Sequence, residues 1–146
     1  MKLAIMQPYL FPYVGYWQLI HAVDRFVIYD DVNYIKGGWV NRNRILINET
    51  PSYITLPLHQ ASSYKCICDT SLQISINWRG KLLKMINNTY RKFPFFTDVF
   101  PVLEEVILYE TENLADFLAN QLLKLSGFIG ITTEFVLTSR NYKNQF

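Results

Sequence analysis

Short apolar runs near the amino terminus flank a segment with helical periodicity. Lys2–Met6 and Arg25–Tyr29 are dominated by apolar residues, which is the pattern of buried parallel strands. Between them, the apolar residues of Val14–Ala22 recur on one helical face, and Pro12 suits the start of such a helix. A strand, a helix and a second strand in close succession predict a βαβ unit, and therefore a parallel sheet.

The middle of the chain has the pattern of an antiparallel hairpin. Asn41–Ile47 and Ser52–Leu58 are rich in β-forming residues, and residues 48–51 between them favour a four-residue turn. A polar loop is expected over 59–65. Alternating polar and apolar positions then predict a strand over Ser71–Ile76.

The last third of the chain is mainly helical in pattern. Thr111 or Asn113 is a suitable N-cap for the final helix, and Gly127 is the expected left-handed residue after it. Three helices and one more strand are predicted: Gly80–Phe93 (closed by Pro94), Pro101–Tyr109, the capped segment up to Gly127, and the strand Ile131–Leu137.

These elements predict one α/β domain over residues 1–146. It has a parallel sheet that opens with the βαβ unit, an inserted antiparallel hairpin and carboxyl-terminal helices. A domain that opens in this way and finishes with a single strand has not obviously closed its sheet. The last strand is then an edge, or the chain is shorter than the fold to which it belongs. An exposed edge would favour a homo-oligomer.

Composition narrows the function classes. Half of the residues are apolar and 18% are charged, which excludes a disordered chain. A net charge of +2 argues against a nucleic-acid-binding protein. The amino-terminal apolar stretch is interrupted by proline, glycine and glutamine, so neither a signal peptide nor a transmembrane segment is expected, and the protein is predicted to be cytoplasmic.

The turn that follows the first predicted strand is a candidate ligand site. In parallel α/β sheets ligands bind beyond the carboxyl ends of strands, where helix N-termini attract anions. Nucleotidyltransferases open this helix with an H-x-G-H tetrad, and here the corresponding positions are Tyr13, Val14, Gly15 and Tyr16. Tyrosine can donate a hydrogen bond but carries no positive charge at neutral pH, so cationic stabilisation of a phosphoryl group would be missing. The alternative is an aromatic turn that simply packs.

Asp30 and Asp31 end the second predicted strand side by side. Adjacent strand residues face opposite ways, so one carboxylate could enter a site while the other caps a loop. No second acidic motif is close in sequence, so a metal site is not predicted. Turn formation or capping is the alternative role for both residues.

A dense set of hydrogen-bond donors follows, beside an aromatic residue. If a strand begins near Asn41, then Asn41 and Asn43 share one face and Arg42 and Arg44 share the other. An arginine pair matches a phosphate or a carboxylate, and Trp39 could stack on a sugar or a base. A solvated edge strand is the alternative.

Other chemistries lack their residues. Cys66 and Cys68 form a C-x-C pair, which is neither a disulfide framework nor a four-ligand metal site. The histidines, His21 and His59, are not clustered, so zinc is improbable. No G-x-S-x-G elbow, P-loop or Rossmann fingerprint is present, and no cofactor is assigned.

Taken together, these segments resemble the WbqC-like proteins of bacteria. The resemblance is carried by AIMQPYLFPYVGYWQLI and RFVIYDDVNYIKGGWVNRNRI, and more loosely by ITLPL and YRKFPFF. It extends to about Leu137, and family members usually continue beyond that point, so a carboxyl-terminally shortened member is expected. Genes of the family lie among those for surface polysaccharide (O-antigen) assembly, and a role in decorating sugars with glycine or another amino acid has been suggested. The resemblance implies a site at Gln7, Pro8, Tyr13, Gly15, Tyr16, Asp30, Asp31, Trp39, Asn41, Arg42, Asn43 and Arg44.

Two functions are therefore carried forward. The first is a nucleotidyltransferase-like transferase that takes a nucleotide sugar or an activated acyl donor. Arg42, Arg44 and Gly15 would hold its phosphate or carboxylate, and Asp30 or Asp31 would act as general base on a sugar hydroxyl or amine. The second is a binding or scaffold protein that keeps the pocket without chemistry.

Overall fold

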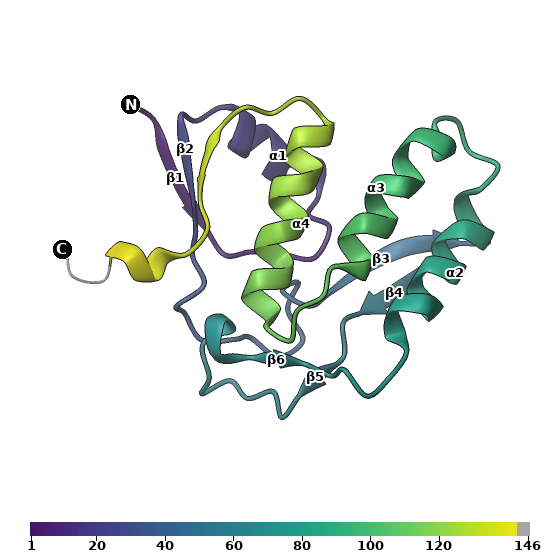
Figure 1. The fold of residues 1–146 in the computed structure, drawn as a ribbon, viewed down its shortest axis with the longest axis horizontal. Coiled ribbons are helices and arrows are strands. Elements are labelled where there is room, and N and C mark those ends of the chain that lie inside the picture. The colour runs from purple at the N-terminus through teal and green to yellow at the C-terminus, as the bar shows by residue number, and fades with distance from the viewer. Residues whose placement is uncertain (143–146) are drawn as a thin grey trace.

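The computed structural model describes residues 1–142, which contain a parallel sheet, a separate antiparallel hairpin and four α-helices (Figure 1). The strands are β1 (Leu3–Met6), β2 (Arg25–Ile28), β3 (Arg42–Ile47), β4 (Thr50–Thr55), β5 (Leu58–His59), β6 (Ser71–Leu72) and β7 (Glu134–Val136). The helices are α1 (Val14–His21), α2 (Trp78–Tyr90), α3 (Phe96–Leu108) and α4 (Leu114–Phe128), with the 3-10 turns η1 (Ile67–Asp69) and η2 (Ser139–Tyr142). The predicted α/β class, parallel sheet and hairpin are thus confirmed.

The parallel sheet has the strand order β1-β2-β7, and the predicted βαβ unit forms its first half. Both connections step in the same direction across the sheet, so right-handed crossovers place their helices on the same face. Accordingly, Tyr16 of α1 and Leu122 of α4 pack in one buried cluster with Ala4, Phe26 and Ile28 of the sheet. Figure 1 shows α4 lying along this sheet.

The opposite face of the sheet is partly open. Leu3 and Ile5 are 48% and 50% exposed, although their run predicts a strand buried on both faces. The prediction was half right, because β1 is an edge strand with helices on one side only. Among the described residues, β7 forms the other edge of this sheet.

The hairpin of β3 and β4 has a tighter turn than predicted. Asn48 and Glu49 both have positive φ, at 49° and 62°, and Thr50 already pairs with Ile47. A two-residue turn with positive φ at both positions matches the twist of antiparallel strands, which explains why it replaces the expected four-residue turn. β4 also ends at Thr55, before Pro57.

The helices begin and end differently from the prediction in two places. α3 begins at Phe96, and Pro101 lies inside it, so a start at Pro101 was wrong. Proline removes one backbone hydrogen-bond donor from the helix. The helix nevertheless continues through Pro101, which lies at an exposed position. The strand expected over Ser71–Ile76 is limited to β6, which pairs with β5. Among the described residues, no helix combines the length and apolar character needed to cross a bilayer.

Helix α4 shows how its termini are fixed. The Asn113 side chain accepts a hydrogen bond of 3.0 Å from the Asp116 N–H, which confirms it as the N-cap. At the other end, Gly130 has φ of 79°, and the Ile131 N–H donates to the Ser126 carbonyl at 2.9 Å. This is a Schellman motif, so the left-handed residue is Gly130 and the prediction of Gly127 was wrong.

Two buried clusters lie on different sides of α4. Phe117 and Leu118 belong to the larger cluster, formed with the hairpin, α2, α3 and η1. Ala119 and Leu122 belong to the smaller one, formed with α1 and the parallel sheet. α4 therefore joins the two parts of the molecule, which explains why so much of its surface is buried.

Candidate functional site

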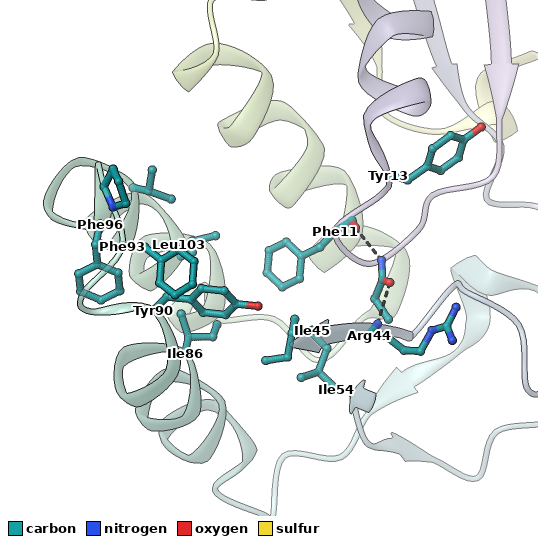
Figure 2. A pocket seen from close by; sticks show the side chains of 13 residues that line it. Phe11, Tyr13, Arg44, Ile45, Ile54, Ile86, Tyr90, Phe93, Phe96 and Leu103 are labelled. Atoms are coloured by element: carbon teal, nitrogen blue, oxygen red, sulfur yellow. Dashed lines mark hydrogen bonds between the residues drawn. The ribbon is translucent and has the colours of Figure 1, made fainter. Parts of the chain in front are cut away.

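A cavity of about 540 Å³ lies between the hairpin and the pair α2 and α3, and we call it the hairpin cavity. Its volume is in the range of small-molecule sites. Figure 2 shows side chains of α2 and α3 on one side and those of the hairpin and the turn before α1 on the other. It is lined by Phe11, Tyr13, Asn43, Arg44, Ile45, Ile54, Ile86, Tyr90, Phe93, Pro94, Phe96, Val99 and Leu103.

The walls of this cavity are almost entirely apolar. Aromatic rings and branched aliphatic side chains supply most of the surface, and Arg44 is the one charged residue among those that line it. The Tyr90 hydroxyl accepts a hydrogen bond of 3.1 Å from the Leu46 N–H, so its own proton remains available to a ligand. The cavity therefore suits a ligand with a large apolar part and a single polar end.

The turn before α1, residues 7–13, is fastened to the hairpin by one side chain. The Asn43 Nδ2 donates to the carbonyls of Leu10 and Phe11, at 2.9 and 2.7 Å. Phe11 has a positive φ of 43°, a conformation that costs a bulky residue free energy and needs support. The Phe11 N–H gains that support from Gln121 of α4, whose Oε1 accepts it at 3.0 Å. We call residues 7–13 the aromatic turn.

Both arginines lie on the outer face of the hairpin, together with Trp39 and Tyr53. The rings of Trp39 and Tyr53 stack at 6.4 Å, and the Arg44 guanidinium carbon lies 5.4 Å from the Trp39 ring centroid. Arg42 donates to the carbonyls of Gly37 and Gly38, so its guanidinium is partly occupied. Within residues 1–142, the Arg44 side chain forms no hydrogen bond or ion pair. Arg44 is therefore a cation without a hydrogen-bond partner in the described residues; it lines the hairpin cavity, and its guanidinium points away from it, over the outer face (Figure 2).

The asparagines share the inner face, opposite the arginines, as the alternation predicts. Asn41 is buried, and its Oδ1 accepts the Tyr34 hydroxyl at 2.7 Å while its Nδ2 donates to the Leu56 carbonyl at 2.9 Å. Burial raises the pKa of Tyr34, partly offset by Arg42, so the phenol stays a donor. Asn41 thus holds the hairpin in place and does not line the hairpin cavity.

The predicted residues around α1 have mixed positions. Tyr16 is buried, and its hydroxyl donates to the Gln7 carbonyl at 2.8 Å. Burial raises the pKa of Tyr16, with a smaller contribution from Tyr9. Tyr13 is 73% exposed and lines the cavity. A Cβ at Gly15 would lie 2.4 Å from the Tyr13 ring, so Gly15 makes room for that ring.

The two acidic residues lie elsewhere. Neither Asp30 nor Asp31 lines the hairpin cavity. Asp30 is 1% exposed, and its Oδ1 accepts from Thr138 Oγ1 at 2.9 Å and from the Ser139 N–H at 3.0 Å. The Ser139 hydroxyl also contacts Asp31 Oδ1. The segment after β7, which had no predicted role, therefore binds both acids.

One group of possible metal donors occurs among the described residues. Ligand atoms of Cys66, Cys68 and Asp69 lie within 4.8 Å of one another. Burial, with smaller contributions from the carboxylates of Asp69 and Asp30, raises the pKa of Cys68 to about 11, so the thiolate that a metal requires is disfavoured. No fourth histidine, cysteine or carboxylate in residues 1–142 joins this group.

Sequence reasoning missed most of the cavity wall. Ile86 and Phe93 lie on the inward face of one predicted helix, and Leu103 lies on that of the next. Such spacing does not distinguish a filled core from an open cavity. The four consecutive aromatic and proline residues 93–96 were the available signal, because three of them, Phe93, Pro94 and Phe96, line the cavity where α2 and α3 connect.

Comparison with known proteins agrees with the resemblance seen in the sequence. The chain is 30% identical over 133 residues to "Uncharacterized protein Rv1507c" of Mycobacterium tuberculosis, and the match covers 90% of this chain and 58% of that protein. No solved structure matches the chain, so a nucleotidyltransferase-like type of sheet has no support from a structural neighbour. The model of the WbqC-like protein family matches residues 7–145. The chain therefore belongs to the WbqC-like protein family.

Proposed function

We propose that this chain is a cytoplasmic ligand-binding domain of surface-polysaccharide assembly that takes an activated acyl donor into the hairpin cavity. The single observation that carries this proposal is an apolar cavity of about 540 Å³ in which Arg44 is the one charged lining residue. Burial of an acyl or aromatic group would supply affinity in proportion to the apolar area removed from water. A phosphate or carboxylate on the same ligand would pair with the Arg44 guanidinium after this exposed side chain turns from Trp39 toward the cavity.

The walls favour one of the two predicted donor classes. A nucleotide sugar carries many hydrogen-bonding groups, and burying them without partners is costly. Most residues that line the hairpin cavity offer no side-chain partner. An acyl donor buries mainly methylene groups and needs a polar contact only at its end. The geometry therefore supports the acyl donor over the nucleotide sugar.

Titration with decanoate tests this function, with decanol as the uncharged probe. We expect wild-type protein to bind both and to prefer decanoate. Arg44→Gln should weaken decanoate about tenfold and leave decanol unchanged, because it removes only the charge-assisted contact. Lys36→Gln removes an exposed cation that does not line the cavity and should change neither affinity.

A second pair of variants tests the cavity itself. Val99→Trp fills it from α3 and should abolish binding of both probes, whereas Thr97→Trp, on an exposed position of the same helix, should not. Equal decanoate affinity in wild type and Arg44→Gln, or undiminished binding to Val99→Trp, would refute the proposal.

A transferase is the second candidate, favoured by the position of Asp30 after β2. Sites in parallel α/β sheets lie beyond the carboxyl ends of strands, and Asp30 lines a second cavity there. With Asp30 or Asp31 as general base, Asp30→Asn or Asp31→Asn should lower product formation from acyl or nucleotide-sugar donors by about 10²–10⁴. Wild-type turnover in both variants would remove the base role.

A further inference from the structure

The second cavity, of about 550 Å³, lies beyond the ends of β2 and β7, and we call it the sheet-edge cavity. Ala115 and Ala119 lie one turn apart on α4, and their short side chains leave this space beside the helix. No residue that lines it lines the hairpin cavity. It is lined by Asp30, Tyr109, Asn113, Ala115, Asp116, Ala119, Asn120, Leu123, Leu137, Thr138 and Arg140.

Asp30 presents a half-satisfied carboxylate to this cavity. Its Oδ1 accepts hydrogen bonds from Thr138 Oγ1 and the Ser139 N–H, at 2.9 and 3.0 Å, and lies 3.1 Å from the Ser139 hydroxyl, which also contacts Asp31 Oδ1. Its Oδ2 forms an ion pair with Arg140 Nε at 3.7 Å. That distance is too long for a hydrogen bond, so a buried oxygen retains its accepting capacity.

Two further acceptors line the first turns of α4. The Asp116 carboxylate accepts the Tyr109 hydroxyl at 3.2 Å and retains unused lone pairs. Asn120 lies one turn later on the same face, and in residues 1–142 its amide forms no hydrogen bond. Both polar atoms of the Asn113 amide are already engaged, because Oδ1 caps α4 and Nδ2 donates to the Cys68 carbonyl at 2.7 Å.

The charges of the lining residues select the ligand. Two carboxylates, Asp30 and Asp116, face one guanidinium, Arg140, which leaves an excess of one negative charge. Arg140 is exposed and its Nε also donates to Thr138 Oγ1 at 3.0 Å, so it can leave Asp30 without unfolding the site. Because the lining carboxylates offer more hydrogen-bond acceptors than this cavity has free donors, we expect a ligand that is rich in hydrogen-bond donors.

We propose that the sheet-edge cavity binds a hydroxylated small molecule that carries a protonated amine, such as an amino sugar. Its ammonium group would displace Arg140 from Asp30 Oδ2 and approach Asp116. Its hydroxyl groups would donate to Asp116 and bond with the Asn120 amide. The proposal is independent of the hairpin cavity, because the two cavities have no residue in common.

Calorimetric titration with glucosamine tests this site, with glucose and N-acetylglucosamine as matched probes that lack the charge. Glucosamine should bind, and both uncharged sugars should bind at least about tenfold more weakly, since a charge-assisted contact is lost. Absence of glucosamine binding, or equal affinity for glucose, would overturn the proposal.

Three exposed positions then locate the binding. Asp116→Asn should weaken glucosamine about tenfold, whereas Glu112→Gln, an equally exposed carboxylate outside the cavity, should not. Arg140→Gln should strengthen glucosamine about fivefold, because it removes the competing cation. Weaker binding to Arg140→Gln would indicate an anionic ligand and contradict the proposal, as would equal losses in Asp116→Asn and Glu112→Gln.

Discussion

The hairpin cavity and the sheet-edge cavity have nearly the same volume, about 540 and 550 Å³, but opposite walls. The first is built from aromatic and aliphatic side chains, with Arg44 as the one charged residue that lines it. The second brings together two carboxylates, two amides and a guanidinium. Volume alone therefore says little about a ligand. Apolar walls give affinity without fixing the orientation of a ligand. Unsatisfied polar groups instead select a ligand whose hydrogen-bonding groups match their own.

The two cavities also differ in how they are held. The hairpin cavity depends on the aromatic turn, which is fixed to α4 by Gln121 and to β3 by Asn43. The sheet-edge cavity lies directly against α4 and the strand ends, and the segment after β7 closes it. A change in the aromatic turn should therefore disturb the first cavity and spare the second.

Of the variants that should affect one cavity and spare the other, Gln121→Leu should have the largest effect. Gln121 is fully buried, accepts from the Phe11 N–H and donates to the Tyr9 carbonyl, both at 3.0 Å. Leucine would leave both backbone groups without a partner, and the free energy of unfolding should fall by about 3 kcal/mol in chemical denaturation. Decanoate binding should weaken, because Phe11 lines the hairpin cavity, while glucosamine binding should persist. Unchanged stability, or equal loss of both ligands, would break the comparison.

A smaller effect is expected from Gly15→Ala, which sharpens the role of Tyr13. The new Cβ would displace the Tyr13 ring, which is exposed and free to rotate. Alanine favours a helix by about 1 kcal/mol over glycine, so the free energy of unfolding should change by less than about 1 kcal/mol. Decanoate affinity should fall slightly, because the cavity loses part of its wall, and glucosamine affinity should not change. A loss of stability above about 2 kcal/mol would show that Tyr13 cannot move.

Much of the fold was predictable because the apolar patterns are local. The strand-helix-strand opening, the hairpin and the Asn113 cap all follow from spacing within a few residues. The prediction put Pro51 in the turn of the hairpin, but the turn is formed by Asn48 and Glu49, which both have positive φ. It also put Pro101 at the start of a helix, but α3 begins at Phe96 and contains Pro101. Boundaries of this kind depend on contacts that a single sequence does not display.

The site was less predictable because its contacts are distant in sequence. The alternation of side chains along the strand correctly separated the asparagines from Arg42 and Arg44. It did not predict that Asn43 would bind the aromatic turn, because the partners of Asn43 are the carbonyls of Leu10 and Phe11, more than 30 residues earlier in the chain. The bond between Asp30 and Ser139 spans 109 residues, and no local pattern reveals it. The general-base roles of Asp30 and Asp31 are therefore a proposal. Asp30 lines the sheet-edge cavity, which the sequence did not indicate.

The most direct test of two independent sites is backbone amide NMR of the full chain, titrated with decanoate and then with glucosamine. Decanoate should shift amides of residues 43–45 and 86–103 and leave residues 113–123 in place. Glucosamine should then shift residues 113–123 and Thr138 without releasing decanoate. If either ligand moves both sets of amides, or if one ligand displaces the other, the account of two separate cavities is contradicted.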